Sequence, residues 1–483
     1  MDDDAIGLPI KLGPCSNGEF VPTPPTDVVL EAARRAREAC DVNARRTGVS
    51  RRDFLLSLAG AATTLSVLAA CSKEKERSTS ATTGGTFDVP DEATTSTSAA
   101  REVLNSDGFV MDVQTHFLEY DDTGDPPSFW GEIFPQSRCG EADSRDCFST
   151  GYFLDLILAS SDTSVGVLSA VPIVGADAPL SSRRMAEAMD VADELCGNGR
   201  LLMQGHVAPN NGAPDTTIEA MADAATRWPI KAWKAYTHAS GPGWFLDGSD
   251  GTDLGPRFIQ AARDTGVSVI AVHKGFSGGS RFAAPVDVGP AARDNPDVSF
   301  TIYHSGYESG GAEGPYEEAT RDVGVNRLIT SVIDAGLGPG SNVYGELGST
   351  WRALMGDPTK AAHVIGKLLV HLGEDNVIWG TDSIWYGSPQ DQIQAFRAFE
   401  ITPAFQEQFG YPALTAQIKA KILGLNAARV YGVDPETVTR CELSPEEREE
   451  LRLSMPSVNS TFGPRTRAQV VAHQRAHGFE VAV

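Results

Sequence analysis

The stretches "VSVIAVH" (267–273) and "VSFTIYH" (298–304) are short apolar runs that each end on a histidine. Runs of this length, bounded by polar and turn-forming residues, predict buried strands. The segment between them is long enough for a crossover connection, which indicates that the two strands are parallel. Both histidines are then expected at the same edge of one sheet.

The same alternation of short apolar runs and helical patterns extends through most of the chain. Helical spacing of apolar residues is clearest at 181–196, 216–228 and 254–266. Eight runs with crossover helices predict an α/β fold, a (β/α)8 TIM barrel over residues 105–433. A doubly wound open sheet is the alternative, but no glycine-rich phosphate turn follows the first run. The six further strand candidates are 108–116, 164–172, 201–208, 230–237, 342–349 and 376–382.

A barrel places catalytic side chains at the carboxyl ends of its strands. Four residues that carry metal or proton-transfer chemistry stand at these predicted ends: His116, His273, His304 and Asp382. We expect them to meet at one mouth, although they are far apart in the chain. Lys234 and Glu346 also end predicted strands, whereas His206 and His238 are weaker candidates.

Imidazole nitrogen and carboxylate oxygen are ligands of catalytic divalent ions. His116, His273 and Asp382 are therefore the predicted ligands of one ion, with zinc expected and manganese as the alternative. Such an ion acidifies water and polarises a carbonyl, and His304 is the predicted acid or base beside it. Lys234 is a predicted contact for a substrate carboxylate. Glu346 is either a substrate contact, a partner of a ligand histidine, or a structural acceptor.

Several of these motifs together resemble one family. The segments "MDVQTHF", "KAYTH", "VHKG", "IYHSG", "GTDSIWYGSP" and "ILGLNAARVYGV" look like the amidohydrolase-related branch of the amidohydrolase superfamily. The resemblance implies a metal-dependent TIM barrel with the ligand and proton-transfer roles assigned above. Gln114 stands where that family most often has a histidine. An amide oxygen is a poorer donor than imidazole, so Gln114 is a weak fourth metal contact or the mark of a decayed site.

The family resemblance implies more than one reaction. A hydrolase acting on a small organic amide, ester or lactone is the favoured function. The alternative within the family is a decarboxylase that works without redox chemistry. The alternative from another class is a catalytically degenerate lipoprotein that only binds a ligand.

The first 104 residues are predicted to lie outside the barrel. Arg51 and Arg52 precede an apolar run that ends at Cys71, which resembles a twin-arginine export signal with a lipobox (residues 1–71). We therefore expect export to the cell envelope and lipidation at Cys71; a retained anchor helix is the alternative. Residues 72–104 are rich in Ser, Thr and charge and predict a disordered tether.

Other features limit the partners. The net charge of -24 disfavours nucleic acid and an anionic membrane surface, so the lipid anchor is the only expected membrane contact. A small-molecule substrate is expected, and a homo-oligomer is an open alternative. Cys139 and Cys147 either form a clamp in the loop after the first strand or remain free thiols. Residues 434–483 predict a C-terminal helical extension.

Overall fold

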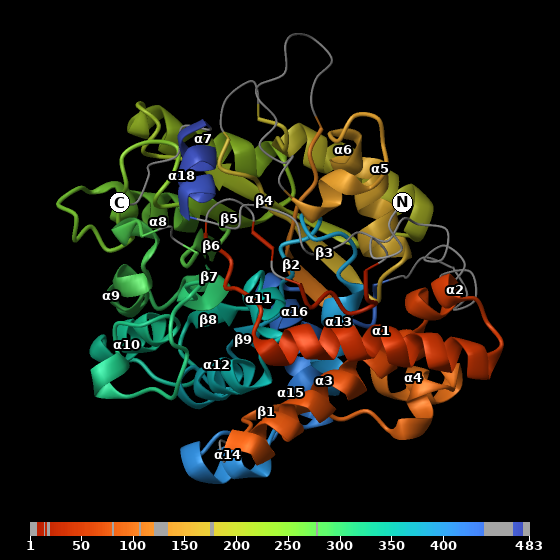
Figure 1. Ribbon diagram of the computed structural model, residues 1–483. Helices are drawn as coiled ribbons and strands as arrows, with labels where there is room; N and C mark the ends of the chain where they lie inside the picture. Colours follow the sequence, from red (N-terminus) through yellow and green to blue (C-terminus); the bar gives the residue numbers. More distant parts are fainter. Residues whose placement is uncertain are drawn as a thin grey trace.

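The computed structural model describes residues 7–13, 15–16, 20–79, 82–105, 108–119, 134–173, 178–276, 279–438 and 467–476. Eight parallel strands form a nearly closed barrel that is surrounded by helices (Figure 1). The predicted TIM barrel is therefore confirmed. The strands are β2 (Met111–Thr115), β3 (Val165–Leu168), β4 (Leu201–Val207), β5 (Ile230–Tyr236), β6 (Val269–His273), β7 (Ser299–Tyr303), β8 (Val343–Glu346) and β9 (Val377–Ile378).

The barrel closes where β9 meets β2. The backbone N–H of Val113 donates to the Trp379 carbonyl (3.1 Å), and the N–H of Asp382 donates to the Gln114 carbonyl (3.0 Å). A parallel bridge joins Thr115 to Ser383 just beyond β9. β9 has only two residues, so Asp382 lies in the loop after the strand and not at its last position. This seam places Asp382 beside Gln114.

Helices cover the outside of the barrel, and their apolar stripes pack against its strands. The structure has α5 (Thr150–Phe153), α6 (Ser182–Cys196), α7 (Pro214–Arg227), α8 (Leu254–Asp264), α9 (Val288–Asp294), α10 (Asn326–Asp334), α11 (Thr350–Leu354), α12 (Pro358–His371), α13 (Gln390–Ala398), α14 (Pro403–Phe409), α15 (Ala416–Ala420) and α16 (Asn426–Tyr431). In the predicted C-terminal extension, residues 439–466 and 477–483 lie outside the described residues, and the described part contains the helix α18 (Arg467–Ala476).

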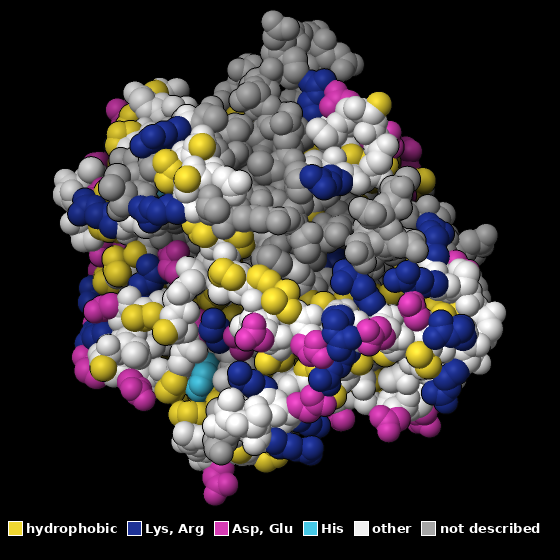
Figure 2. Space-filling model, in the orientation of Figure 1, with side chains coloured by type: hydrophobic (Ala, Val, Ile, Leu, Met, Phe, Trp, Pro, Cys, Tyr) yellow, Lys and Arg dark blue, Asp and Glu magenta, His cyan; other side chains and the backbone are white. Residues whose placement is uncertain are grey.

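The first three helices of the described chain are α1 (Asp27–Thr47), α2 (Arg51–Leu56) and α3 (Leu58–Thr79), and they precede the barrel. Side chains of α3, among them Leu65 and Leu68 with no exposed surface, join the main hydrophobic core. The outer face of α1 carries both charge signs (Figure 2), as where Arg34 pairs with Glu31 and Glu38. α1 is thus amphipathic, and the N-terminal helices are part of the folded body.

Residues 72–104 differ from the predicted disordered tether. β1 (Gly85–Phe87) pairs antiparallel with β10 (Phe399–Ile401), and α4 (Thr97–Leu104) buries Ala100 and Leu104 completely. Composition missed this order because the partner strand supplies the backbone hydrogen bonds and only a few apolar side chains are needed to anchor the segment. The tether prediction is corrected for the described residues of this segment.

The predicted signal segment has a clear place in the structure. Cys71, the predicted lipidation site, lies in α3 and is 5% exposed. Among the described helices, none combines the length and apolarity needed to cross a bilayer. These two observations do not test export of the chain or lipidation of Cys71, so both stay predictions.

The N-terminal segment is anchored to the barrel by Lys11. Its ammonium donates to the carbonyls of Tyr386 (2.7 Å) and Ser388 (3.1 Å) and lies 3.4 Å from Asp391 Oδ1. Burial lowers the pKa of Lys11, and Asp391 opposes that shift. We expect Lys11→Met to lower the free energy of unfolding by about 3 kcal/mol, because it leaves the buried Asp391 without its cation.

Chemical denaturation measures this loss. The control is Arg34→Met, which removes an exposed ion-pairing arginine and should cost at most about 1 kcal/mol. The double variant Lys11→Met/Asp391→Asn should regain part of the loss. Equal effects of Lys11→Met and Arg34→Met would contradict the structural role of Lys11.

Candidate active site

The loops that follow the barrel strands contain all the strained non-glycine positions of the described chain. Positive φ angles occur at Ser240, Phe276, His304, Ser305, Ser349 and Asp382. Each follows β5, β6, β7, β8 or β9 at the carboxyl end. Such conformations are uncommon for residues with a Cβ and persist where surrounding contacts hold them. The strain therefore marks this mouth as the candidate site.

Asp382 is the hub of polar contacts at the mouth. Its Oδ1 accepts hydrogen bonds from Gln114 Nε2 (2.9 Å) and Trp385 Nε1 (3.1 Å), and its Oδ2 accepts from Ser349 Oγ (2.6 Å). Burial raises the pKa of Asp382, but the contact with His116 and the neighbouring imidazoles outweigh burial and lower it to about 2. Asp382 is an anion at neutral pH.

His116 faces this carboxylate. Its Nδ1 lies 2.6 Å from the Ser169 carbonyl, so Nδ1 carries the hydrogen. In the neutral ring Nε2 then has a lone pair, and it lies 3.1 Å from Asp382 Oδ1. Trp385 stacks on the imidazole with the ring centroids 5.1 Å apart. Two acceptor atoms thus face each other unless a proton or cation lies between them.

His273 and His304 repeat this arrangement. His304 Nδ1 donates to the Gly348 carbonyl (2.6 Å) and His273 Nε2 donates to the Gly275 carbonyl (3.0 Å). The remaining nitrogens, His304 Nε2 and His273 Nδ1, face each other at 3.3 Å. Burial lowers the pKa of His304 to about 4, although Asp382 opposes the shift, and burial also lowers the pKa of His273 well below its usual range. Both rings are neutral near pH 7, so lone pairs again face each other.

The donor set fits a divalent cation. The His116–Asp382 contact and the His273–His304 contact each need a proton or a cation between the two facing atoms. Gln114 Oε1, buried and without a hydrogen-bond partner, adds an orphaned acceptor. Within the described part of the chain, no three His, Cys, Asp or Glu side chains already surround one point. The ligand roles of His116, His273, Asp382 and Gln114 therefore stay predictions.

Lys234 lies in the barrel interior beside two tyrosines. Its ammonium is 3.5 Å from the centroid of the Tyr303 ring and 4.6 Å from that of Tyr236, and the residue has no exposed surface. His238 lies next to the mouth, with its ring centroid 4.7 Å from that of His273. Burial lowers the pKa of His238 to about 3 and that of His206 to about 4. His206 and His238, the two weaker candidates, therefore lie in the same barrel interior as Lys234.

Glu346 lies beneath the mouth and is completely buried. Its Oε2 accepts the backbone N–H of His304 (2.9 Å), and its Oε1 accepts that of Gly348 (2.5 Å). Burial raises its pKa to about 8. These contacts match the structural alternative, since Glu346 holds the loop that carries His304. A substrate contact by Glu346 stays a prediction.

Sequence reasoning missed Ser349 and Tyr386. Ser349 donates to Asp382, and the Tyr386 hydroxyl lies 2.8 Å from Ser349 Oγ. Their hydroxyls have no sequence signal of their own, although both follow predicted strand ends closely. In the loop after β2, Cys139 and Cys147 form a disulfide, so the clamp is present.

The barrel region of the chain matches a known protein family. A family model described as "Amidohydrolase" matches residues 111–433. No curated protein matched the chain.

Solved structures also resemble the chain. A manganese-bound 5-carboxyvanillate decarboxylase from Novosphingobium aromaticivorans is 14% identical over 68% of this chain and 97% of that chain (TM-score 0.39). A putative 2-pyrone-4,6-dicarboxylic acid hydrolase from Pseudomonas putida is 15% identical over 70% and 99% (TM-score 0.41). A 2,6-dihydroxybenzoate decarboxylase from Rhizobium is 14% identical over 67% and 98% (TM-score 0.38).

Proposed function

Because the chain belongs to the amidohydrolase family, whose model covers residues 111–433, we propose that it is a metal-dependent hydrolase of a small organic amide, ester or lactone. The observation that supports this most is the meeting of imidazole and carboxylate groups at one mouth, where His116 Nε2 lies 3.1 Å from Asp382 Oδ1 and His304 Nε2 lies 3.3 Å from His273 Nδ1. His116, His273 and Asp382 would hold the ion, with Gln114 Oε1 as a further contact. Zinc is the expected ion, and manganese also suits these nitrogen and oxygen donors.

A divalent ion at this place supplies Lewis acidity toward a carbonyl group and makes water a stronger acid. The protein's own residues would supply proton transfer, positioning of the ligands and contact with the substrate. His304 Nδ1 is held by the Gly348 carbonyl, so Nε2, which faces His273 Nδ1, has the lone pair that would take a proton from water and return it to the leaving nitrogen or oxygen. Ser349 and Trp385 fix the carboxylate of Asp382, and Trp385 covers one face of His116. Lys234 would contact an oxygen of the substrate.

A decarboxylase is the second candidate. Lys234 is a buried cation beside Tyr303 and Tyr236, and its charge suits a substrate carboxylate. In that reaction His304 or a neighbour would deliver a proton to the carbon that loses carbon dioxide. The donor set for the ion would be the same.

Metal analysis of the purified full chain tests the proposal. We expect close to one divalent ion per chain and turnover of a member of an amide, ester and lactone panel that stops on chelation. Release of carbon dioxide from an aromatic acid, with no hydrolysis, would favour the decarboxylase. A chain that binds no divalent ion would contradict both and leave the ligand-binding alternative.

Gln114 offers a graded test of the ion site. Gln114→His is expected to tighten ion binding by roughly tenfold, because imidazole is a better donor than an amide oxygen. Competition with a chromophoric chelator measures this. Gln114→Met, which keeps the length of the side chain but removes the amide, is the control and should weaken binding. Identical affinities in all three proteins would exclude position 114 from the ion's surroundings.

A further inference from the structure

A turn closed by a disulfide bond packs against the loop after β9. This disulfide turn, residues 134–148, contains two short 3₁₀ helices, Pro135–Arg138 and Asp146–Phe148. The bond between Cys139 and Cys147 joins the end of the first helix to the second, and both cysteines are buried. The disulfide turn is therefore a firmly closed unit beside the barrel mouth.

Trp385 links the disulfide turn to the candidate ion site. Its indole Nε1 donates to Asp382 Oδ1 (3.1 Å), and its ring stacks on His116 with the centroids 5.1 Å apart. Two rings of the disulfide turn pack against the same indole, Phe134 at 4.6 Å and Phe148 at 5.8 Å between centroids. One indole thus contacts two predicted ion ligands and the disulfide turn at once.

Backbone hydrogen bonds tie the disulfide turn to both loops that carry these ligands. The N–H of Gln136 donates to the Trp385 carbonyl (3.1 Å), and the N–H of Leu118 donates to the Phe148 carbonyl (2.8 Å). Within the turn, Gln136 Nε2 donates to the Cys147 carbonyl (2.9 Å). The disulfide bond therefore fixes the spacing between the loop after β9 and the loop after β2.

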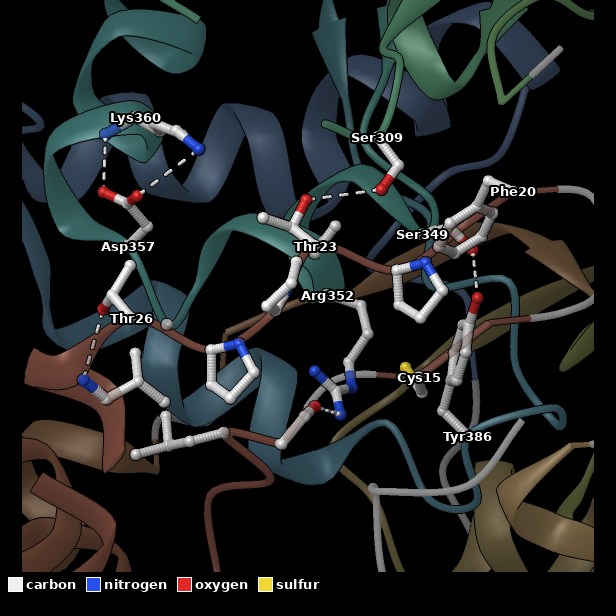
Figure 3. A pocket seen from close by; sticks show the side chains of 18 residues that line it. Cys15, Phe20, Thr23, Thr26, Ser309, Ser349, Arg352, Asp357, Lys360 and Tyr386 are labelled. Carbon is white, nitrogen blue, oxygen red and sulfur yellow. Dashed lines mark hydrogen bonds and ion pairs between the residues drawn. The ribbon is translucent and has the colours of Figure 1, made fainter. Parts of the chain in front are cut away.

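The second oxygen of Asp382 is held from another direction. Ser349 Oγ donates to Oδ2 (2.6 Å) and lies 2.8 Å from the Tyr386 hydroxyl. Both hydroxyl residues line a cavity of about 90 Å³ that the N-terminal segment closes over Arg352 (Figure 3). The disulfide turn therefore acts on the other oxygen, Oδ1, which faces His116 Nε2 at 3.1 Å.

We propose that the Cys139–Cys147 disulfide positions Trp385 against the predicted ion ligands and thereby raises the affinity of the site for a divalent ion. A disulfide restricts the conformations open to the loop that it closes. Groups that orient a ligand from outside the ligand set change ion affinity by about 10- to 100-fold. This inference rests on the proposed function and adds a dependence on thiol state to it: the oxidised chain binds the ion more tightly than the reduced chain.

Fluorine NMR of the full chain, labelled with 5-fluorotryptophan and treated with a chelator, tests the positioning step without an ion. The chain has seven tryptophans, and the resonance that is missing in Trp385→Phe belongs to Trp385. In Cys139→Ser/Cys147→Ser we expect this resonance to shift or broaden, because the two phenylalanine rings no longer hold the indole. Cys196→Ser, which removes a disulfide bond at the end of α6, is the control and should leave the Trp385 resonance in place.

Competition with a chromophoric chelator then measures ion affinity in the same proteins. We expect Cys139→Ser/Cys147→Ser to bind the ion roughly tenfold more weakly than the wild type, and Cys196→Ser to stay within twofold. By reciprocity, a saturating ion should make the Cys139–Cys147 bond roughly tenfold harder to reduce at equilibrium. Dithiothreitol, which forms its cyclic disulfide as the two cysteines become thiols, measures this in Cys196→Ser. A bond that only stabilises the fold would lower the Tm of the double variant and leave its ion affinity unchanged, which would overturn the proposal.

The two measurements separate the positioning step from the ion site itself. A shifted Trp385 resonance without ion binding in any of the proteins would contradict the proposed function and support the positioning of Trp385. An unchanged Trp385 resonance in the double variant, with normal ion binding, would overturn the positioning and leave the proposed function intact. If the double variant does not melt cooperatively, Phe134→Leu decides, because it keeps the disulfide bond and removes one ring from Trp385. A Trp385 resonance and an ion affinity that both stay as in the wild type would then overturn the proposal.

Discussion

Replacement of Asp382 by asparagine is expected to reduce the divalent-ion content to background and to abolish turnover. Asp382 supplies the only carboxylate of the predicted ligand set and is ionised, with a pKa of about 2. Asparagine keeps the shape but removes the charge and turns an amide N–H₂ toward Gln114 Nε2 or Ser349. We expect ion affinity to fall by at least about 100-fold, since changes outside the ligand shell alone cost 10- to 100-fold.

Metal analysis and steady-state kinetics on the same preparation measure this effect. The control is Asp375→Asn, which makes the same change in a half-exposed carboxylate paired with Lys421 on the surface. Asp375→Asn should keep its ion and its activity. Full ion occupancy in Asp382→Asn would remove Asp382 from the ligand set.

His304→Asn is expected to separate chemistry from ion binding. Asparagine tolerates the positive φ of 66° at this position, so the loop should keep its shape. It cannot take up a proton as imidazole Nε2 does. We therefore expect kcat to fall by about 10²- to 10⁴-fold while the ion content stays within twofold of the wild type.

Metal content and kcat are again measured together. Ser240→Asn is the matched control, because Ser240 also has a positive φ (66°) in a loop after a strand, but its hydroxyl donates to the Pro172 carbonyl and not to a predicted site residue. It should change neither quantity by more than twofold. Loss of the ion in His304→Asn would make His304 a ligand, and unchanged kcat would exclude it from proton transfer.

Local sequence pattern was enough to predict where the four candidate ligand and proton-transfer residues lie. His273 ends β6, His304 follows β7 directly and His116 follows β2. A strand is recognised from its own apolar residues, and the barrel then places its end at the mouth. Asp382 was placed at a strand end, but β9 stops at Ile378, since the residues beyond it pair with the loop after β2.

The N-terminal region was not predictable in this way. Its apolar run has the composition of an export signal, yet α3 contributes Leu65 and Leu68 to the core, and β1 completes a second small sheet with β10. Composition reports how much apolar surface a segment has. It does not report whether another part of the chain offers a surface to bury it.

The sequence by itself determined the eight strands, the barrel and the presence of His116, His273, His304 and Asp382 at one mouth. These follow from apolar periodicity and short-range backbone geometry, which each segment carries on its own. Only the tertiary structure decided which atoms face one another. Gln114 donates to Asp382 across 268 positions, and the N-terminal segment closes a cavity over Arg352. Such contacts depend on where barrel closure and packing bring distant side chains, and no local pattern encodes that distance.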